Sequence, residues 1–144
     1  MLKIKKTVLE EIQNRFLSNA NVEQGFLLGS EKNLEQVDMC GSIPVKQTST
    51  YFIVPDAKQV DEMIDNWAKR KICFCGMIHS HVRQKEELSD ADILFAKQLY
   101  RAYQLPFLWF GIGVVKHDKL EFEFYRLRQT DCHVLIEAAE YIGV

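Results

Sequence analysis

Two histidines separated by a single residue, His79 and His81, are the first pair whose spacing suggests chemistry. His79 ends a short apolar stretch, 72–79, that predicts a buried β-strand, and His81 follows two residues later. Side chains two apart on a strand point the same way, with Cα atoms about 6.6–7 Å apart, so both rings could reach one ion at about 2 Å. The pair alone is equally typical of polar residues that finish a strand.

Ser89 and Asp92 follow the histidines and add a second signal. A carboxylate at the start of a helix would complete three zinc ligands and leave the fourth position open to water, as in catalytic zinc sites. The same Ser-x-x-Asp pattern matches a capping box, in which the serine caps the helix and the acid meets its positive end. Both interpretations can hold at once, but capping gives no reason for the spacing to the histidines.

Other patterns of zinc or nucleophile chemistry fail on spacing or are absent. Cys73 and His81 would lie about 26 Å apart on one strand, so Cys73 and Cys75 cannot join the histidines around one ion and are interpreted as core residues. The sequence lacks the zinc-deaminase and His-Glu-x-x-His signatures, a serine nucleophile elbow and a glycine-rich phosphate loop. His117, in a predicted hairpin turn, and His133, in the predicted last helix, are given no role.

The elements that must position these residues follow from apolar spacing and turn residues. Helices are expected over 7–18, from Pro55-Asp56 onward, from Ser89 onward, and from Asp131 to Ile142. The helix that starts at Ser89 is expected to bury the face with Ile93, Leu94, Ala96, Leu99 and Tyr100. Strands are expected over 25–29, 35–43, 50–54, 72–79, 107–115 and 120–127, with Trp109 and Phe110 in the core. The mixture lacks a regular β-α-β alternation, which predicts an α+β sheet with helices packed on it.

Length and composition bound the class of protein. The chain has 144 residues, 47% hydrophobic and 26% charged, which predicts one soluble domain over 1–144. With 18 basic and 20 acidic residues the net charge is −2, so nucleic acid and membrane surfaces are not expected partners. No signal peptide or membrane span is predicted, so the expected compartment is the cytoplasm, with the four cysteines as reduced thiols.

The stretch His79-Ser80-His81, seven residues, Ser89, two residues and Asp92 resembles the signature of the JAMM (MPN+) zinc metalloprotease family, His-Ser/Thr-His-x7-Ser-x2-Asp. The order of elements is also similar over about residues 5–128, with 129–144 left as a C-terminal helix. The resemblance implies a single MPN/JAB-like domain: a mixed β-sheet flanked by helices, similar to the cytidine-deaminase-like sandwich.

The resemblance also implies an activity and its residues. His79, His81 and Asp92 would bind Zn²⁺ with a water as fourth ligand, and Ser89 would hydrogen-bond the oxyanion during hydrolysis of a peptide or isopeptide bond. Substrates of the family are C-terminal tails of ubiquitin-like proteins, and compact members resemble prokaryotic enzymes acting on ubiquitin-like or sulfur-carrier proteins. A protein substrate of this kind is therefore expected, whereas the oligomeric state is not predicted.

Two positions depart from the family pattern: Val82, where many members have proline, and the position of the general base. The general base of the family is the glutamate in Glu-x-x-Gly-x-Leu-x-Gly, and Val22 occupies that position here, with Glu23 one residue later. A shortened turn would deliver the Glu23 carboxylate to the site, whereas a regular strand would aim it at the opposite face. We take Glu23 as the predicted base. The alternative is a non-catalytic MPN-type interaction or scaffold module, which the displaced glutamate favours and the intact ligand set opposes.

Overall fold

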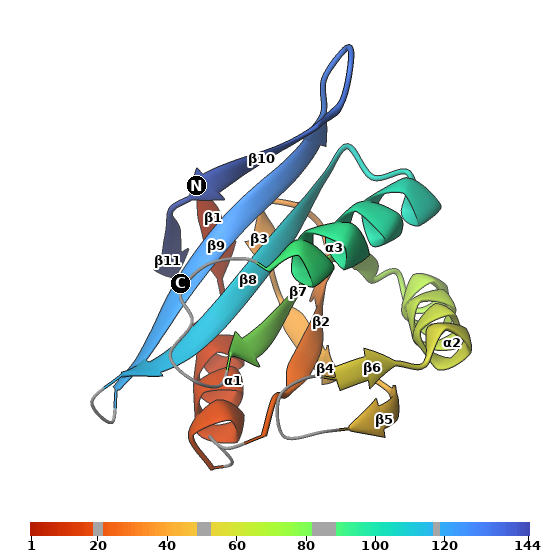
Figure 1. The fold of residues 1–144 in the computed structure, drawn as a ribbon. Coiled ribbons are helices and arrows are strands. Elements are labelled where there is room, and N and C mark those ends of the chain that lie inside the picture. The colour runs from red at the N-terminus through yellow and green to blue at the C-terminus, as the bar shows by residue number, and fades with distance from the viewer. Residues whose placement is uncertain (19–21, 49–52, 82–88, 117–118) are drawn as a thin grey trace.

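The structure, a computed structural model, describes residues 1–18, 22–48, 53–81, 89–116 and 119–144. Within these ranges the chain forms a mixed α+β fold with three helices and a central six-stranded sheet (Figure 1). In chain order the elements are β1 (Leu2–Ile4), α1 (Lys6–Ser18), β2 (Gly25–Ser30), β3 (Gln36–Val37), β4 (Met39–Ser42), β5 (Val45–Thr48), β6 (Ile53–Pro55), α2 (Ala57–Lys69), β7 (Cys73–His81), α3 (Asp90–Tyr103), β8 (Phe107–Lys116), β9 (Lys119–Gln129), β10 (Val134–Ala139) and β11 (Tyr141–Gly143).

The central sheet places the histidine-bearing strand in its interior. Its strand order is β10-β9-β8-β7-β2-β4, with β7 parallel to β8 and the other neighbouring pairs antiparallel. A small parallel sheet of β11, β1 and β3 and a hairpin of β5 and β6 accompany it. Because β2 and β7 run antiparallel, the end of β7 lies beside the beginning of β2, where Gly25 pairs with His79.

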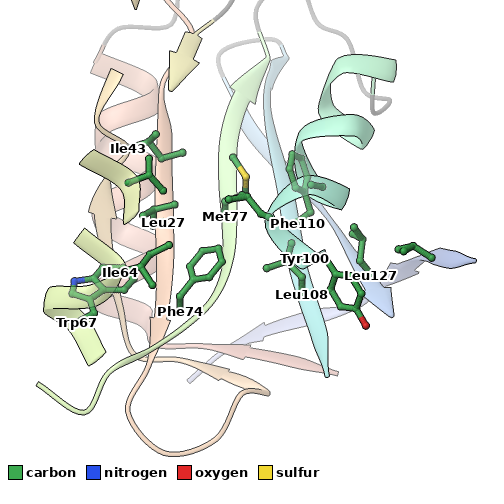
Figure 2. Close-up of a cluster of buried hydrophobic side chains, with 14 of the residues drawn as sticks. Leu27, Ile43, Ile64, Trp67, Phe74, Met77, Tyr100, Leu108, Phe110 and Leu127 are labelled. Carbon is green, nitrogen blue, oxygen red and sulfur yellow. The ribbon is translucent and has the colours of Figure 1, made fainter. Parts of the chain in front are cut away.

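Helices cover both faces of this sheet, so the buried side chains form two clusters (Figure 1). The α1-side cluster consists of Leu2, Ile4, Val8, Ile12, Phe16, Phe26, Leu28, Val37, Cys75, Ile78, Trp109, Phe122 and Phe124. The α3-side cluster consists of Leu27, Ile43, Val60, Ile64, Trp67, Ile72, Phe74, Met77, Ala96, Leu99, Tyr100, Leu108, Phe110, Ile112, Leu127 and Val134. Figure 2 shows Met77 of β7 near the middle of the α3-side cluster, between Leu27 and Phe110.

The predicted starts of α2 and α3 are confirmed, and each has a capping side chain. The Asp56 carboxylate accepts a hydrogen bond from the Gln59 N–H at 3.1 Å, directly after Pro55. Ser89 caps α3, which ends at Gln104 in the left-handed region with φ 49°. None of the helices in the described ranges is long and apolar enough to span a membrane.

The predicted C-terminal helix over 129–144 is wrong. Residues 134–139 form β10, which pairs antiparallel with β9, and residues 141–143 form β11, which pairs parallel with β1. The apolar spacing of the segment fits a helix, but pairing with β9 satisfies backbone groups of both strands and buries Val134. His133 consequently lies in the turn before β10, not in a helix.

Other differences from the predicted elements are smaller. The expected strand 35–43 is divided into β3 and β4 on either side of Asp38, and the expected strand 50–54 is described from Ile53 onward as β6. Leu94, predicted on the buried face of α3, is 57% exposed, and Cys73, predicted as a core residue, is also exposed. The predictions of burial are confirmed for Cys75, Trp109 and Phe110.

Candidate metal centre

The predicted site residues meet where three elements come together. His79 and His81 lie at the end of β7, two residues apart, and therefore point to the same face of the sheet. Asp92 is in the first turn of α3, and Glu23 lies two residues before β2. His79 also packs edge-on against Phe110 of β8, with ring centroids 5.4 Å apart, so the α3-side cluster forms one wall of the site.

The position of Glu23, which the sequence left open, follows from the pairing of β2 with β7. Gly25 is the partner of His79, and a residue two before Gly25 lies on the same face as Gly25 if the extended alternation continues. Glu23 is that residue, whereas Val22 would point to the other face. The Glu23 Oε1 lies 2.9 Å from Nδ1 of His79. The shorter spacing thus brings the carboxylate of Glu23 to the histidines.

The Asp92 carboxylate bridges the two histidines from the other side. Its Oδ1 lies 3.1 Å from Nε2 of His79, and its Oδ2 lies 3.0 Å from Nε2 of His81. The capping box fixes this orientation, because the Ser89 N–H donates to Asp92 Oδ2 at 2.9 Å and the Asp92 N–H donates to Ser89 Oγ at 3.1 Å. The capping and site interpretations of Ser89 and Asp92 are therefore compatible.

The electrostatics of the cluster are dominated by buried groups of opposite charge. Glu23 is 8% exposed and His79 4% exposed. Burial alone would lower the pKa of His79, but the carboxylates of Asp92 and Glu23 outweigh it and raise the pKa to about 9. Burial alone would raise the pKa of Asp92, but its contacts with His79 and His81 hold that pKa well below its ordinary value. The cluster therefore carries two carboxylates that attract positive charge.

A proton on His79 does not give every polar atom of this cluster a hydrogen-bond partner. Nε2 of His79 is close to Asp92 but not aligned for a hydrogen bond, and within the described residues neither it nor Oε2 of Glu23 has a hydrogen-bond partner. Buried polar atoms without a partner are costly, whereas imidazole nitrogens and carboxylate oxygens are the ligands that zinc prefers beside thiolates. These residues fit a divalent metal ion.

The geometry offers two overlapping donor sets for such an ion. One ligand atom each from Glu23, His79 and His81 lies within 4.8 Å of the others, so this group could hold a metal ion. Asp92 faces both Nε2 atoms, which gives the second set of His79, His81 and Asp92. In the first set Glu23 is a ligand, and in the second it orients His79 through Nδ1.

The remaining candidate residues do not join the site. Cys73 is exposed at the far end of β7, and Cys75 belongs to the α1-side cluster. His133 is in the turn before β10, and His117 lies outside the described residues. The contact of Phe110 with His79 was missed by the sequence analysis, which placed Phe110 only in the core; its alternation with Leu108 and Ile112 along β8 gives no sign of a neighbour on β7.

Comparison with known proteins gives the fold and no family. No protein-family model matches the sequence, and no curated protein matches it. Among solved structures, the solution structure of protein DSY2949 from Desulfitobacterium hafniense, a structural genomics target, is similar with a TM-score of 0.73 at 17% identity. The match covers 100% of this chain and 93% of that chain. At this level of identity, the likeness shows a shared fold alone.

Proposed function

We propose that the chain is a zinc-dependent peptidase or isopeptidase of the JAMM type, with an MPN/JAB-like version of the α+β fold. The observation that carries the proposal is the convergence of Glu23, His79, His81 and Asp92, from the segment before β2, from β7 and from α3, with contacts of 2.9–3.1 Å. The opposite placement, with Glu23 on the other face of the sheet, would have favoured the scaffold module.

In this proposal His79, His81 and Asp92 hold the ion, and Glu23 stays outside its ligand set. Bound zinc supplies Lewis-acid chemistry, since it polarises a carbonyl and lowers the pKa of a water molecule toward neutrality. Glu23 would keep the proton of His79 on Nδ1 through Oε1, which would leave the lone pair of Nε2 available to a metal ion.

Glu23 has a second oxygen for the proton transfers of hydrolysis. Because Oε1 contacts His79, Oε2 is the atom that accepts a proton from the attacking water and passes it to the leaving amine. Ser89 accepts the Asp92 N–H with its oxygen, so its own hydroxyl proton can be donated to the negative charge that develops on the carbonyl oxygen. The proposed substrate is the C-terminal tail of a ubiquitin-like or sulfur-carrier protein.

Metal analysis of matched variants tests the ligand assignment. We expect about one zinc per chain by elemental analysis after incubation with zinc and removal of excess, and its loss in His81→Ala and Asp92→Ala. Asp90→Ala is the control, because Asp90 also lies in the first turn of α3 but is not in the cluster. Zinc loss in Glu23→Gln with retention in Asp92→Ala would instead select Glu23, His79 and His81 as ligands.

Turnover tests the role of Glu23. Glu23→Gln should keep its zinc and lose about 10²–10⁴-fold in kcat on a ubiquitin-like or sulfur-carrier protein joined through its C-terminal carboxyl to an amine. Full activity of this variant would remove the base assignment. A folded wild type that binds no zinc would refute the metallopeptidase and return the scaffold module as the better proposal.

A further inference from the structure

Ser80, between the two histidines, faces away from the metal centre and contacts the segment that carries Glu23. Alternation along β7 points its side chain to the α1 side of the sheet, where it is 6% exposed. The Ser80 hydroxyl accepts a hydrogen bond from the Gln24 N–H at 2.8 Å, and the Ser80 N–H donates to the Gln24 carbonyl at 2.8 Å. The backbone N–H and C=O of Gln24 are therefore both held by one residue of β7.

The first of these hydrogen bonds is unusual for a pair of antiparallel strands. In a regular hydrogen-bonded pair, two residues exchange both bonds between backbone atoms. Here the Gln24 N–H, which belongs to the peptide unit joining Glu23 to Gln24, reaches a side-chain oxygen. The side-chain hydroxyl of Ser80 lies at a different place from its backbone carbonyl. The hydrogen bond to this hydroxyl therefore gives the chain at Gln24 a different course from the one that a bond to the carbonyl would give.

A second contact links Gln24 to α1. Its side-chain Nε2 donates to the Arg15 carbonyl, near the end of α1, at 2.8 Å. Gln24 is thereby held between β7 and α1, whereas Glu23 points to the α3 side and contacts His79. The residue directly after Glu23 is thus the position where side-chain bonds replace part of the ladder.

We propose that Ser80 is a positioning residue that, through Gln24, sets the Glu23 carboxylate against His79. The inference rests on the proposed function only for its effect on turnover, since the placement of Glu23 can be measured without a substrate. Ser80 itself touches neither ligand nor reacting atoms in this assignment. Its hydroxyl binds the N–H of Gln24, the residue directly after Glu23.

The first test observes the placement directly, in the zinc-loaded protein with zinc as the only added ligand. In Ser80→Ala, we expect the Gln24 amide hydrogen to exchange about ten-fold faster, because it loses its hydrogen-bond acceptor, and the ¹³C resonance of the Glu23 carboxylate to move. Ser80→Thr, which keeps the hydroxyl, should restore both signals. Ser30→Ala is the matched control, since Ser30 is also a buried serine but bonds to the Asn33 carbonyl.

The second test separates positioning from a general structural role. Ser80→Ala should keep about one zinc per chain and a nearly unchanged KM, while kcat falls roughly 100-fold, as expected when a catalytic group is misplaced by about 1 Å. Ser80→Thr should recover kcat. Equal losses of zinc and kcat, or unchanged Gln24 exchange and Glu23 resonance in Ser80→Ala, would overturn the proposal.

The two tests also distinguish this inference from the proposed function. A wild type that binds zinc but cleaves no substrate contradicts the peptidase, whereas the response of the Gln24 and Glu23 signals to Ser80→Ala would still support the positioning role. Normal turnover in Ser80→Ala would leave the peptidase intact and refute the role of Ser80.

Discussion

The two faces of β7 differ in what they bury, although neighbouring residues of one strand supply both. On the α3 side, His79 ends an apolar cluster with a group of charged side chains from β7, α3 and the segment before β2. On the α1 side, the cluster is made of hydrophobic residues, and Ser80 contributes hydrogen bonds to backbone. One face therefore ends in a group of charged side chains, and the other is packed with apolar side chains.

This difference shows how a small fold can accommodate a buried cluster of charged side chains. Charged groups are costly to bury unless they are paired or bind a metal, so they need a firm frame that holds them at short distances. The α1 side supplies this frame, whereas the charged side chains of the cluster lie on the α3 side. If that division holds, damage to the two faces should have separable consequences for stability and for zinc binding.

The largest expected effect comes from removing a ring on each face. Phe16 and Phe110 are both 0% exposed; Phe16 contacts Phe26 at 5.7 Å between ring centroids, whereas Phe110 contacts His79. Each change to Ala should lower the free energy of unfolding by about 3–5 kcal/mol, measured by urea denaturation. Only Phe110→Ala should also weaken zinc binding in the folded protein. Equal zinc affinity in the two variants would contradict the proposed division between the faces.

Zinc should stabilise the folded chain through the α3 side alone. At zinc concentrations about 100 times Kd, the free energy of unfolding should rise by about 2.7 kcal/mol relative to protein with a chelator, because the unfolded chain lacks the assembled site. The increment, measured by urea denaturation with and without zinc, should vanish in His81→Ala and persist in Asp90→Ala. An increment that survives in His81→Ala would place the ion elsewhere.

The smallest effect concerns a polar group at the rim of the α1 side. Asp38, between β3 and β4, accepts hydrogen bonds from the Glu31 N–H and the Gln36 amide and lies 3.4 Å from Lys5 Nζ. Burial alone would raise the pKa of Asp38, but these contacts lower it below its ordinary 3.8. Asp38→Asn should cost about 1–2 kcal/mol at pH 7.

The lowered pKa of Asp38 also sets the direction of the pH dependence. A carboxyl whose folded pKa lies below its unfolded value stabilises the protein above pH 3.8, and this contribution is lost as the pH falls through the folded pKa. The difference in unfolding free energy between wild type and Asp38→Asn should therefore shrink below that pH. Zinc binding at pH 7 should be the same in both, and a constant difference across the pH range would refute this assignment.

Local patterns in the sequence predicted much of the fold. The helix starts at Asp56 and Ser89 follow from capping side chains beside apolar residues at helical spacing, which act over a few residues. The strand that ends in His79 and His81 was likewise readable from its short apolar run. The strands β10 and β11 were not, because their helix-like spacing is overridden by pairing with β9 and β1, which lie elsewhere in the chain.

The sequence by itself determined which side chains could hold a metal and placed two of them on one strand face, because the period of a β-strand is fixed by the backbone. Only the tertiary structure decided that Glu23, and not Val22, reaches His79. That outcome follows from the register of β2 against β7, which brings together Glu23 and His79, 56 residues apart in the chain. A shift of one residue in such a register exchanges the two faces, and no local pattern specifies it.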